Sequence, residues 1–99
     1  MEVSVDKSAS GYVVKVDGVI KSVSDSQSIK DSLATCTDSS LPIVLLIENS
    51  FSVTSSVIGF LLKKIQADKV NLSIKVGDDR LLDLFKSLNL IDVLRVSKA

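Results

Sequence analysis

The chain lacks histidine and tryptophan altogether, and its 99 residues include one cysteine and one proline. Without histidine there is no imidazole base, no histidine metal ligand and no phosphohistidine. A single cysteine, Cys36, excludes an internal disulfide and a cluster of cysteine ligands. Because Cys36 falls at an apolar position of an expected helix, we interpret it as a small buried side chain and not as a reactive thiol.

An excess of charge is also lacking, since twelve basic and twelve acidic side chains cancel. No basic run with interleaved aromatic residues occurs, so we expect no binding to nucleic acid. The longest apolar run, residues 43–47, is far shorter than the roughly 20 residues of a transmembrane helix, and the first residues do not form a signal peptide. We therefore expect no membrane insertion and a cytoplasmic location.

What the chain does contain is aliphatic side chains, because apolar residues make up 45% of it while only three Phe and one Tyr are present. A core of Val, Ile and Leu suits strands that are covered by helices. At this length we expect one domain, spanning residues 1–99, that is too small for a deep catalytic cleft.

The first half of the chain predicts a hairpin, a helix and a buried strand. Polar and apolar residues alternate over residues 2–6 and 12–17, with a turn over residues 7–11 between them. Ser24 and Gln27 have the spacing of a capping box, which predicts a helix over about residues 25–36. Residues 43–47 are apolar throughout, as in a central strand that is buried on both faces.

A second helix is predicted to begin at Thr54, Ser55 and Ser56. Its buried stripe has helical spacing and consists of Val57, Ile58, Leu61, Leu62 and Ile65. Gly59 and Phe60 lie off this stripe, which suggests that they form part of a contact surface.

The last third predicts a strand over residues 70–76, an aspartate-capped helix and a final strand over residues 91–96. The buried stripe of that helix is Leu81, Leu82, Phe85 and Leu88, and Asn89 suits the left-handed conformation at its end. The order is ββαβαβαβ, which predicts an α/β fold with a mixed, mostly parallel sheet whose first strand is antiparallel to its neighbour.

The hydroxyl groups at the start of the second helix have two interpretations. Thr54, Ser55 and Ser56 lie where the unsatisfied amides of a helix start collect, so they can serve as caps. A phosphoserine at the same place would bring about two negative charges to the positive end of the helix dipole. The fold would tolerate this group, while the surface that a partner contacts would change.

The chain resembles the STAS domain of bacterial anti-sigma-factor antagonists over nearly its whole length. The run Gly11-Tyr-Val-Val-Lys-Val-Asp-Gly18-Val-Ile is similar to the second strand of that family and its turn. The run Phe51-Ser-Val-Thr-Ser55-Ser-Val-Ile-Gly59-Phe-Leu stands at the signature Asp-Ser-Ser/Ala-Gly-Leu-Gly. Ser55, Ser56 and Gly59 agree with this signature, whereas Thr54 replaces its aspartate and Val57 its first glycine.

The resemblance implies a non-enzymatic regulatory module that binds an anti-sigma factor, which is also a serine kinase, and that is switched by phosphorylation. The matching acceptor here is Ser55, and only the unmodified form would capture the kinase. The implied partner-binding residues are Asn49, Ser50, Ser52, Thr54, Ser55, Ser56, Val57, Ile58, Gly59 and Phe60. The family's last helix has no counterpart after Val96, which would favour a homodimer.

Two alternatives remain open at this point. The departures at Thr54 and Val57 favour an adaptor that is never phosphorylated, such as the STAS subunit of a lipid-transport complex. A domain that binds a small ligand or nucleotide is the other alternative. We expect no metal and no cofactor, because helix caps and solvated charges explain three of the four carboxylates that could be considered as a magnesium site: Glu48, Asp78, Asp79 and Asp83. A receiver domain would also need an acidic pair after its first strand, and the chain has none there.

Overall fold

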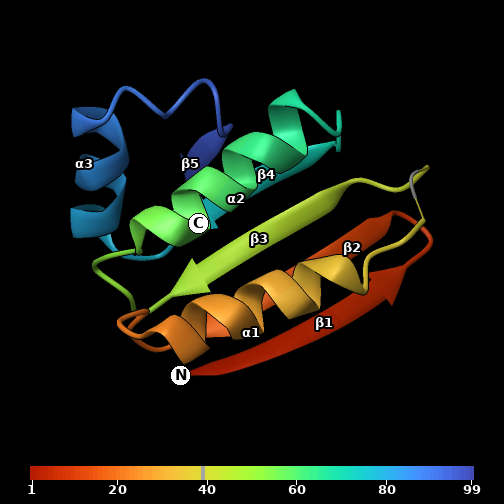
Figure 1. The fold of residues 1–99 in the computed structure, drawn as a ribbon, viewed down its shortest axis with the longest axis horizontal. Helices are drawn as coiled ribbons and strands as arrows, with labels where there is room; N and C mark the ends of the chain where they lie inside the picture. The colour runs from red at the N-terminus through yellow and green to blue at the C-terminus, as the bar shows by residue number, and fades with distance from the viewer. Residues whose placement is uncertain (39) are drawn as a thin grey trace.

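The computed structural model describes residues 1–38 and 40–99 and shows an α/β fold with a five-stranded sheet and three helices (Figure 1). In chain order the elements are β1 (Glu2–Ser8), β2 (Gly11–Asp17), α1 (Val23–Ala34), β3 (Ile43–Glu48), α2 (Ser55–Gln66), β4 (Leu72–Val76), α3 (Asp79–Ser87) and β5 (Val96–Lys98). The element order predicted from the sequence is therefore confirmed.

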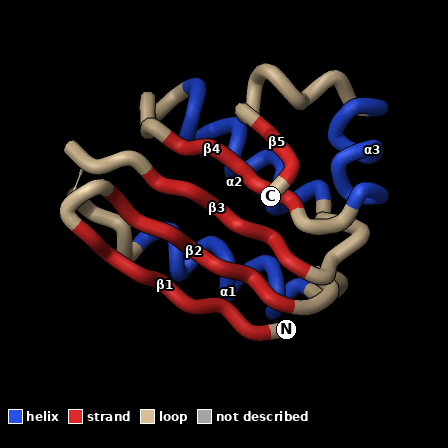
Figure 2. The backbone as a smooth tube through the Cα atoms, turned by 180° about the vertical axis from the view of Figure 1, so that it is seen from behind, coloured by secondary structure: helices blue, strands red, loops and turns tan. Residues whose placement is uncertain are grey.

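The strands lie side by side in chain order, as Figure 2 shows. β1 pairs with β2 in the antiparallel sense, and every later neighbour is parallel. The predicted mixed, mostly parallel sheet is thus confirmed. All three parallel crossovers place a helix after the carboxyl end of a strand, so the three helices start at one edge of the sheet (Figure 1).

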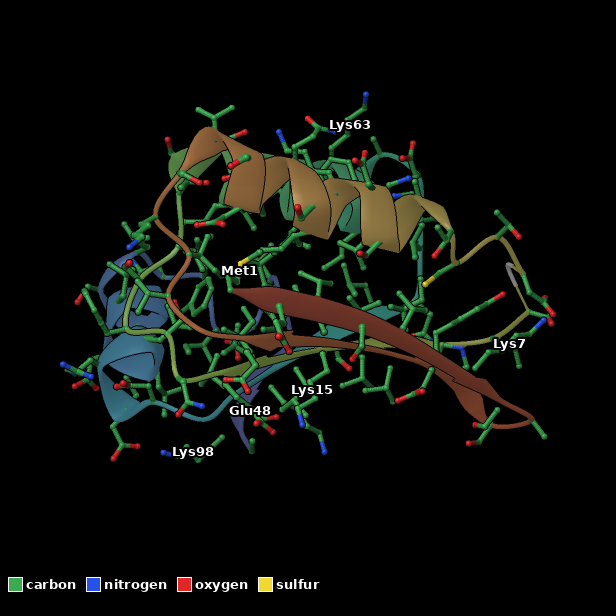
Figure 3. The ribbon with its side chains drawn as sticks, turned by 90° about the horizontal axis from the view of Figure 1, so that it is seen from below. Met1, Lys7, Lys15, Glu48, Lys63 and Lys98 are labelled. Carbon is green, nitrogen blue, oxygen red and sulfur yellow. The ribbon has the colours of Figure 1, made fainter. Side chains whose placement is uncertain are left out.

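The core lies between one face of the sheet and the helices α1 and α2, which lie next to each other on that face (Figure 3). Alternate residues of the strands point into it, as the pleat of a strand requires. The side chains in the middle of this layer are fully buried and come from every layer of the fold: Val14, Val16, Ile29, Leu45, Ile47, Val57, Leu61, Ile74, Val76, Leu81 and Phe85.

No helix of the described chain covers the other face of the sheet (Figure 3). Val13 is 38% exposed there, and Lys15 pairs with Glu48 at 3.7 Å across neighbouring strands. Val44 and Leu46 of β3 are half-buried. The prediction that this strand is buried on both faces is therefore only partly correct. We call this face the open sheet face.

The start of α1 differs from the prediction. Ser22, not Ser24, caps the helix, because its Oγ accepts from the Asp25 N–H at 3.1 Å while the Asp25 carboxylate accepts from the Ser22 N–H at 3.3 Å. The side chain of Gln27 instead donates to Asp31. A carboxylate interacts more strongly with a helix start than a neutral amide does, which explains why the register with Asp25 forms.

The end of the chain also differs from the prediction. A strand over residues 91–96 is wrong, because the Leu94 N–H donates to the Leu90 carbonyl at 3.0 Å and the chain pairs with β4 only from Val96. Leu88 is 47% exposed and does not belong to the buried stripe of α3. Asn89 has φ 57, which confirms the predicted left-handed residue at the helix end.

The hairpin is longer than predicted, since β1 continues to Ser8 and β2 begins at Gly11. Only two residues remain for the turn. Gly11 has φ 148, and a Cβ on it would lie 2.6 Å from the Pro42 carbonyl oxygen. Another residue type at Gly11 would therefore strain the backbone and push β2 away from the start of β3.

Candidate functional site

The loop from β3 into α2 is held tightly against the end of β2. Asn49, the first residue after β3, has φ 58, and its Nδ2 donates to Asp17 Oδ1 at 2.8 Å. The φ value belongs to the left-handed region, which asparagine enters more easily than most residues. This turn directs the loop along the sheet edge toward α1.

Ser50 ties this loop to the segment before α1. Its side chain is fully buried, and its Oγ accepts from the Ile20 N–H at 3.1 Å and donates to the Ser52 carbonyl at 2.7 Å. The Ser52 Oγ reaches the Ile20 carbonyl at 3.4 Å. Ser50 therefore satisfies its own buried hydroxyl and fixes two loops to each other.

Thr54 caps α2, since its Oγ1 accepts from the Val57 N–H at 3.2 Å. The same oxygen lies 2.8 Å from the Oγ of Ser26, a residue of α1 that is 3% exposed. The predicted capping role of this threonine is thus confirmed. The contact with Ser26 also fixes the start of α2 against α1.

Ser55 and Ser56 are the first two residues of α2, and both are exposed. The Ser55 hydroxyl makes no hydrogen bond within residues 1–38 and 40–99, whereas the Ser56 Oγ accepts from Lys30 Nζ at 2.6 Å. Because Thr54 already supplies the cap, neither serine hydroxyl is needed for it. The first turn of α2 therefore presents hydroxyls that the fold itself does not use as caps.

Two of the expected partner-binding residues are not accessible. Val57 and Ser50 are 0% exposed, so neither contacts a partner in this conformation. Val57 packs in the core because it faces the sheet from the first turn of α2. The sequence placed both residues in one contiguous surface segment and did not separate its outer from its inner side.

Gly59 and Phe60 continue the accessible surface along α2. Gly59 is exposed, and nothing lies within 4 Å of the position of a Cβ on it. Phe60 is half-buried, and the Nζ atoms of Lys30 and Lys64 lie 5.9 and 5.5 Å from the centre of its ring. Ile58 is half-buried against the core. We call Ser55, Ser56, Gly59 and Phe60 the α2 surface.

Sequence reasoning missed three side chains beside this site. Phe51 in the loop is 47% exposed, and the Arg80 guanidinium lies 5.0 Å from the centre of its ring. Lys30 comes from the polar side of α1 and contacts Ser56. An irregular loop has no periodicity from which exposure can be predicted, and no local pattern reveals which residues of two helices meet.

The three helix starts differ in charge. Hydrogen bonding, first of all from the Lys21 N–H, lowers the pKa of Asp25 at the start of α1. The side chain of Arg80 lowers the pKa of Asp78, the cap of α3, to about 2, and Asp79 follows in the first turn. α2 has no acidic residue in its first turn. Its start is therefore provided with hydroxyls but with no negative charge of its own.

Three of the four carboxylates considered as metal ligands have other partners. Glu48 pairs with Lys15, Asp78 with Arg80, and Asp79 with Lys98 at 2.7 Å. Among the residues that the structure describes, no three His, Cys, Asp or Glu side chains come together in a way that holds a metal ion.

Cys36 lies just after the carboxyl end of α1, away from the helix starts, and is half-buried against the core. Burial raises the pKa of its thiol, which disfavours the reactive thiolate. Beside it is an apolar cavity of about 30 Å³, lined in part by Leu33, Ile43 and Leu72. This volume suits a water molecule, not a nucleotide.

A scan of the chain against models of protein families gave no match, and a search among curated proteins gave none either. Within the described residues, no helix has the length and apolar character that crossing a membrane requires.

Proposed function

We propose that the chain is a non-enzymatic regulatory module that binds a protein partner through the α2 surface and is switched by phosphorylation of Ser55. The observation that carries this proposal is that the residues at the start of α2 have separate roles. Thr54 makes the cap, Val57 anchors the turn, and Ser55 stands exposed with an uncommitted hydroxyl. The resemblance to STAS domains supports the choice of Ser55 and of a partner that is an anti-sigma factor and serine kinase.

The local electrostatics support a phosphate at this position. A phosphoserine carries close to two negative charges at neutral pH, and helix starts favour negative charge. α1 and α3 already hold aspartates in their first turns, while α2 holds none. A phosphate on Ser55 would thus meet no neighbouring carboxylate from its own helix turn, and the fold would retain its Thr54 cap.

The effect on a partner follows from the position of Ser55 within the α2 surface. A partner that packs on Ser56, Gly59 and Phe60 would have to bury the phosphate. Because burying its charge is unfavourable, the partner would dissociate. Changing a partner from mostly bound to mostly free takes roughly 5.5 kcal/mol of differential affinity, and burying an unpaired charge supplies an energy of this order. We propose that this occurs in the cytoplasm, without a cofactor.

The test is incubation of the chain with its cognate kinase and ATP, followed by mass mapping of the phosphate. We expect modification of Ser55 and loss of partner binding in Ser55→Glu. Ser4→Glu, which adds the same charge on an exposed residue of β1, is the matched control and should bind as the wild type does. Absence of phosphate on Ser55, together with unchanged binding by Ser55→Glu, would eliminate the switch.

A constitutive adaptor of the same fold is the second candidate. It is favoured by Thr54, which supplies a cap but no carboxylate to orient a kinase, and by Val57, which stands where the family signature has a glycine. A pull-down from cells separates the two candidates. Recovery of an ATPase or a transporter component supports the adaptor, and recovery of a serine kinase supports the switch.

A further inference from the structure

We propose that the partner inserts an acidic side chain, Asp or Glu, next to an apolar one, into a groove between the starts of α1 and α2. This inference rests on the proposed function, because it names the chemistry of the partner that the α2 surface binds. The groove has a volume of about 180 Å³, and its walls include Lys21, Val23, Lys30, Thr54 and Ser56. We call it the lysine groove.

The two lysines of this groove are available to a ligand. Lys21 and Lys30 form no salt bridge with any carboxylate among residues 1–38 and 40–99, where four of the twelve basic side chains have an acidic partner: Lys15, Lys64, Arg80 and Lys98. Asp25 and Asp31, the acids of α1, pair with neither lysine side chain in the described chain. Asp25 accepts from the backbone N–H groups of Lys21 and Ser22, and Asp31 accepts from Gln27.

Lys30 is also held in place. Its Nζ donates to the Ser56 Oγ at 2.6 Å and lies 5.9 Å from the centre of the Phe60 ring. A lysine whose side chain is already positioned loses less conformational freedom when it binds a carboxylate than a mobile surface lysine does. A carboxylate that accepts from Lys30 would form a charge-assisted hydrogen bond, which is about twice as strong as a neutral one.

The apolar part of the ligand is indicated by Val23. This side chain is 87% exposed, the highest exposure among the large apolar residues of the described chain, and it stands at the groove in the first turn of α1. Val23 offers contact area for one apolar side chain of a partner. Two lysines around so small a volume fit one or two side chains, not the row of phosphates of a nucleic acid.

The lysine groove gives the proposed switch its direction. Ser55 is adjacent to Ser56, whose hydroxyl Lys30 contacts. A phosphate on Ser55 would place its negative charge close to Lys30, so that it attracts this lysine within the chain and repels the acidic side chain of the partner. Phosphorylation would therefore release the partner.

The test is an NMR titration of the isotope-labelled chain with a twelve-residue peptide of alternating Glu and Leu, and with the same peptide carrying Gln for Glu. We expect the Glu peptide to shift the amide signals of Lys21, Lys30 and Ser56 and to bind less tightly as salt is added. Equal binding by the Gln peptide, or shifts confined to the open sheet face, would overturn the proposal.

Charge reversal provides the matched comparison. Lys30→Glu should weaken binding of the Glu peptide by about tenfold or more, while Lys75→Glu, on an exposed residue of the open sheet face, should leave it unchanged. Lys30→Gln, which preserves the ability to hydrogen-bond to Ser56, keeps the test valid if reversal unfolds the chain, and it should also weaken binding. An equal loss in Lys75→Glu would contradict the proposal.

A twelve-nucleotide single-stranded DNA of mixed sequence is a further arm. Tighter binding of this DNA than of the Glu peptide at the lysine groove would overturn the acidic partner in favour of a nucleic acid. A cellular protein that is captured in a Ser55-dependent manner, but with no response to salt or to Lys30→Glu, would overturn the lysine groove alone and leave the proposed function standing.

Discussion

The start of α2 and the starts of α1 and α3 lie at the same edge of the sheet but are stabilised differently (Figure 1). α1 and α3 use the carboxylates of Asp25 and Asp78, which accept backbone N–H groups. α2 uses the Thr54 hydroxyl and the buried Val57. α2 is therefore attached from beneath, by packing, and its first turn carries no acidic residue.

The largest change in stability is expected when the packing beneath α2 is removed. Leu61 is 0% exposed and lies one turn after Val57, so Leu61→Ala should lower the free energy of unfolding by about 2–5 kcal/mol. Urea denaturation followed by circular dichroism measures the change. A loss below about 1 kcal/mol would show that core packing is not what holds α2.

The next test removes the cap. Thr54→Ala takes away the acceptor of the Val57 N–H and the contact with Ser26, and we expect a loss of about 1 kcal/mol, within the range of 0.5–2 for helix caps. Ser55→Ala is the matched control and should change stability by less than about 0.5 kcal/mol. Equal losses in the two variants would mean that Ser55 is structural and not free for modification.

Gly59 allows a test in the opposite direction. It is exposed on α2, and nothing lies within 4 Å of the position of its Cβ, so Gly59→Ala should raise stability by about 0.5–1 kcal/mol. Thermal melting measures this gain. Loss of partner binding in this more stable variant would show that the partner approaches α2 closely at Gly59. A loss of stability would contradict the open position of its Cβ.

Charge addition compares two helix starts directly. Ser55→Asp places a carboxylate at the start that has none, and we expect it to stabilise the chain by about 0.3–1 kcal/mol at low salt. Ser24→Asp, in the first turn of α1 beside Asp25, is the control and should stabilise less because the two carboxylates repel each other. Equal gains would remove the electrostatic difference between the two starts.

The smallest effect is a local response to acid. The pKa of Asp78 is about 2, below its ordinary value of 3.8, so the stability that its ionised form contributes is present above pH 3.8 and lost as the pH falls toward 2. The lowered pKa of Asp25 acts in the same direction. Amide exchange between pH 5 and 2 should therefore show fraying of α1 and α3 starts, while the first turn of α2, without a carboxylate, stays protected. Earlier fraying of α2 would contradict this.

Much of the fold could be predicted from the sequence, because strands and helices of this size have clear periodicities. The stripe of Val57, Leu61 and their neighbours predicted the inward side of α2, and the apolar run from Ile43 predicted β3. One error arose where two local signals compete. Ser22 and Ser24 both begin a capping pattern, and only the pairing with a charged residue, Asp25, decides between them.

The second error concerns the end of the chain. Residues 91–96 are mostly apolar, as in a strand, yet Arg95 has φ 52 and ends a turn before the chain joins the sheet. A left-handed arginine is uncommon, so no local pattern predicts it. At the site, the sequence named Ser55, but the contact of Lys30 with Ser56 depends on the packing of α1 against α2, which no short-range pattern contains.

Hydrogen exchange of the chain with and without a captured partner is the most direct test of whether a protein partner binds at the start of α2. We predict that the partner slows exchange at the amides of residues 55–60 and that the effect is lost in Ser55→Glu. The open sheet face, represented by Val13, Val44 and Leu46, should exchange unchanged. Protection that is confined to the open sheet face would contradict the account.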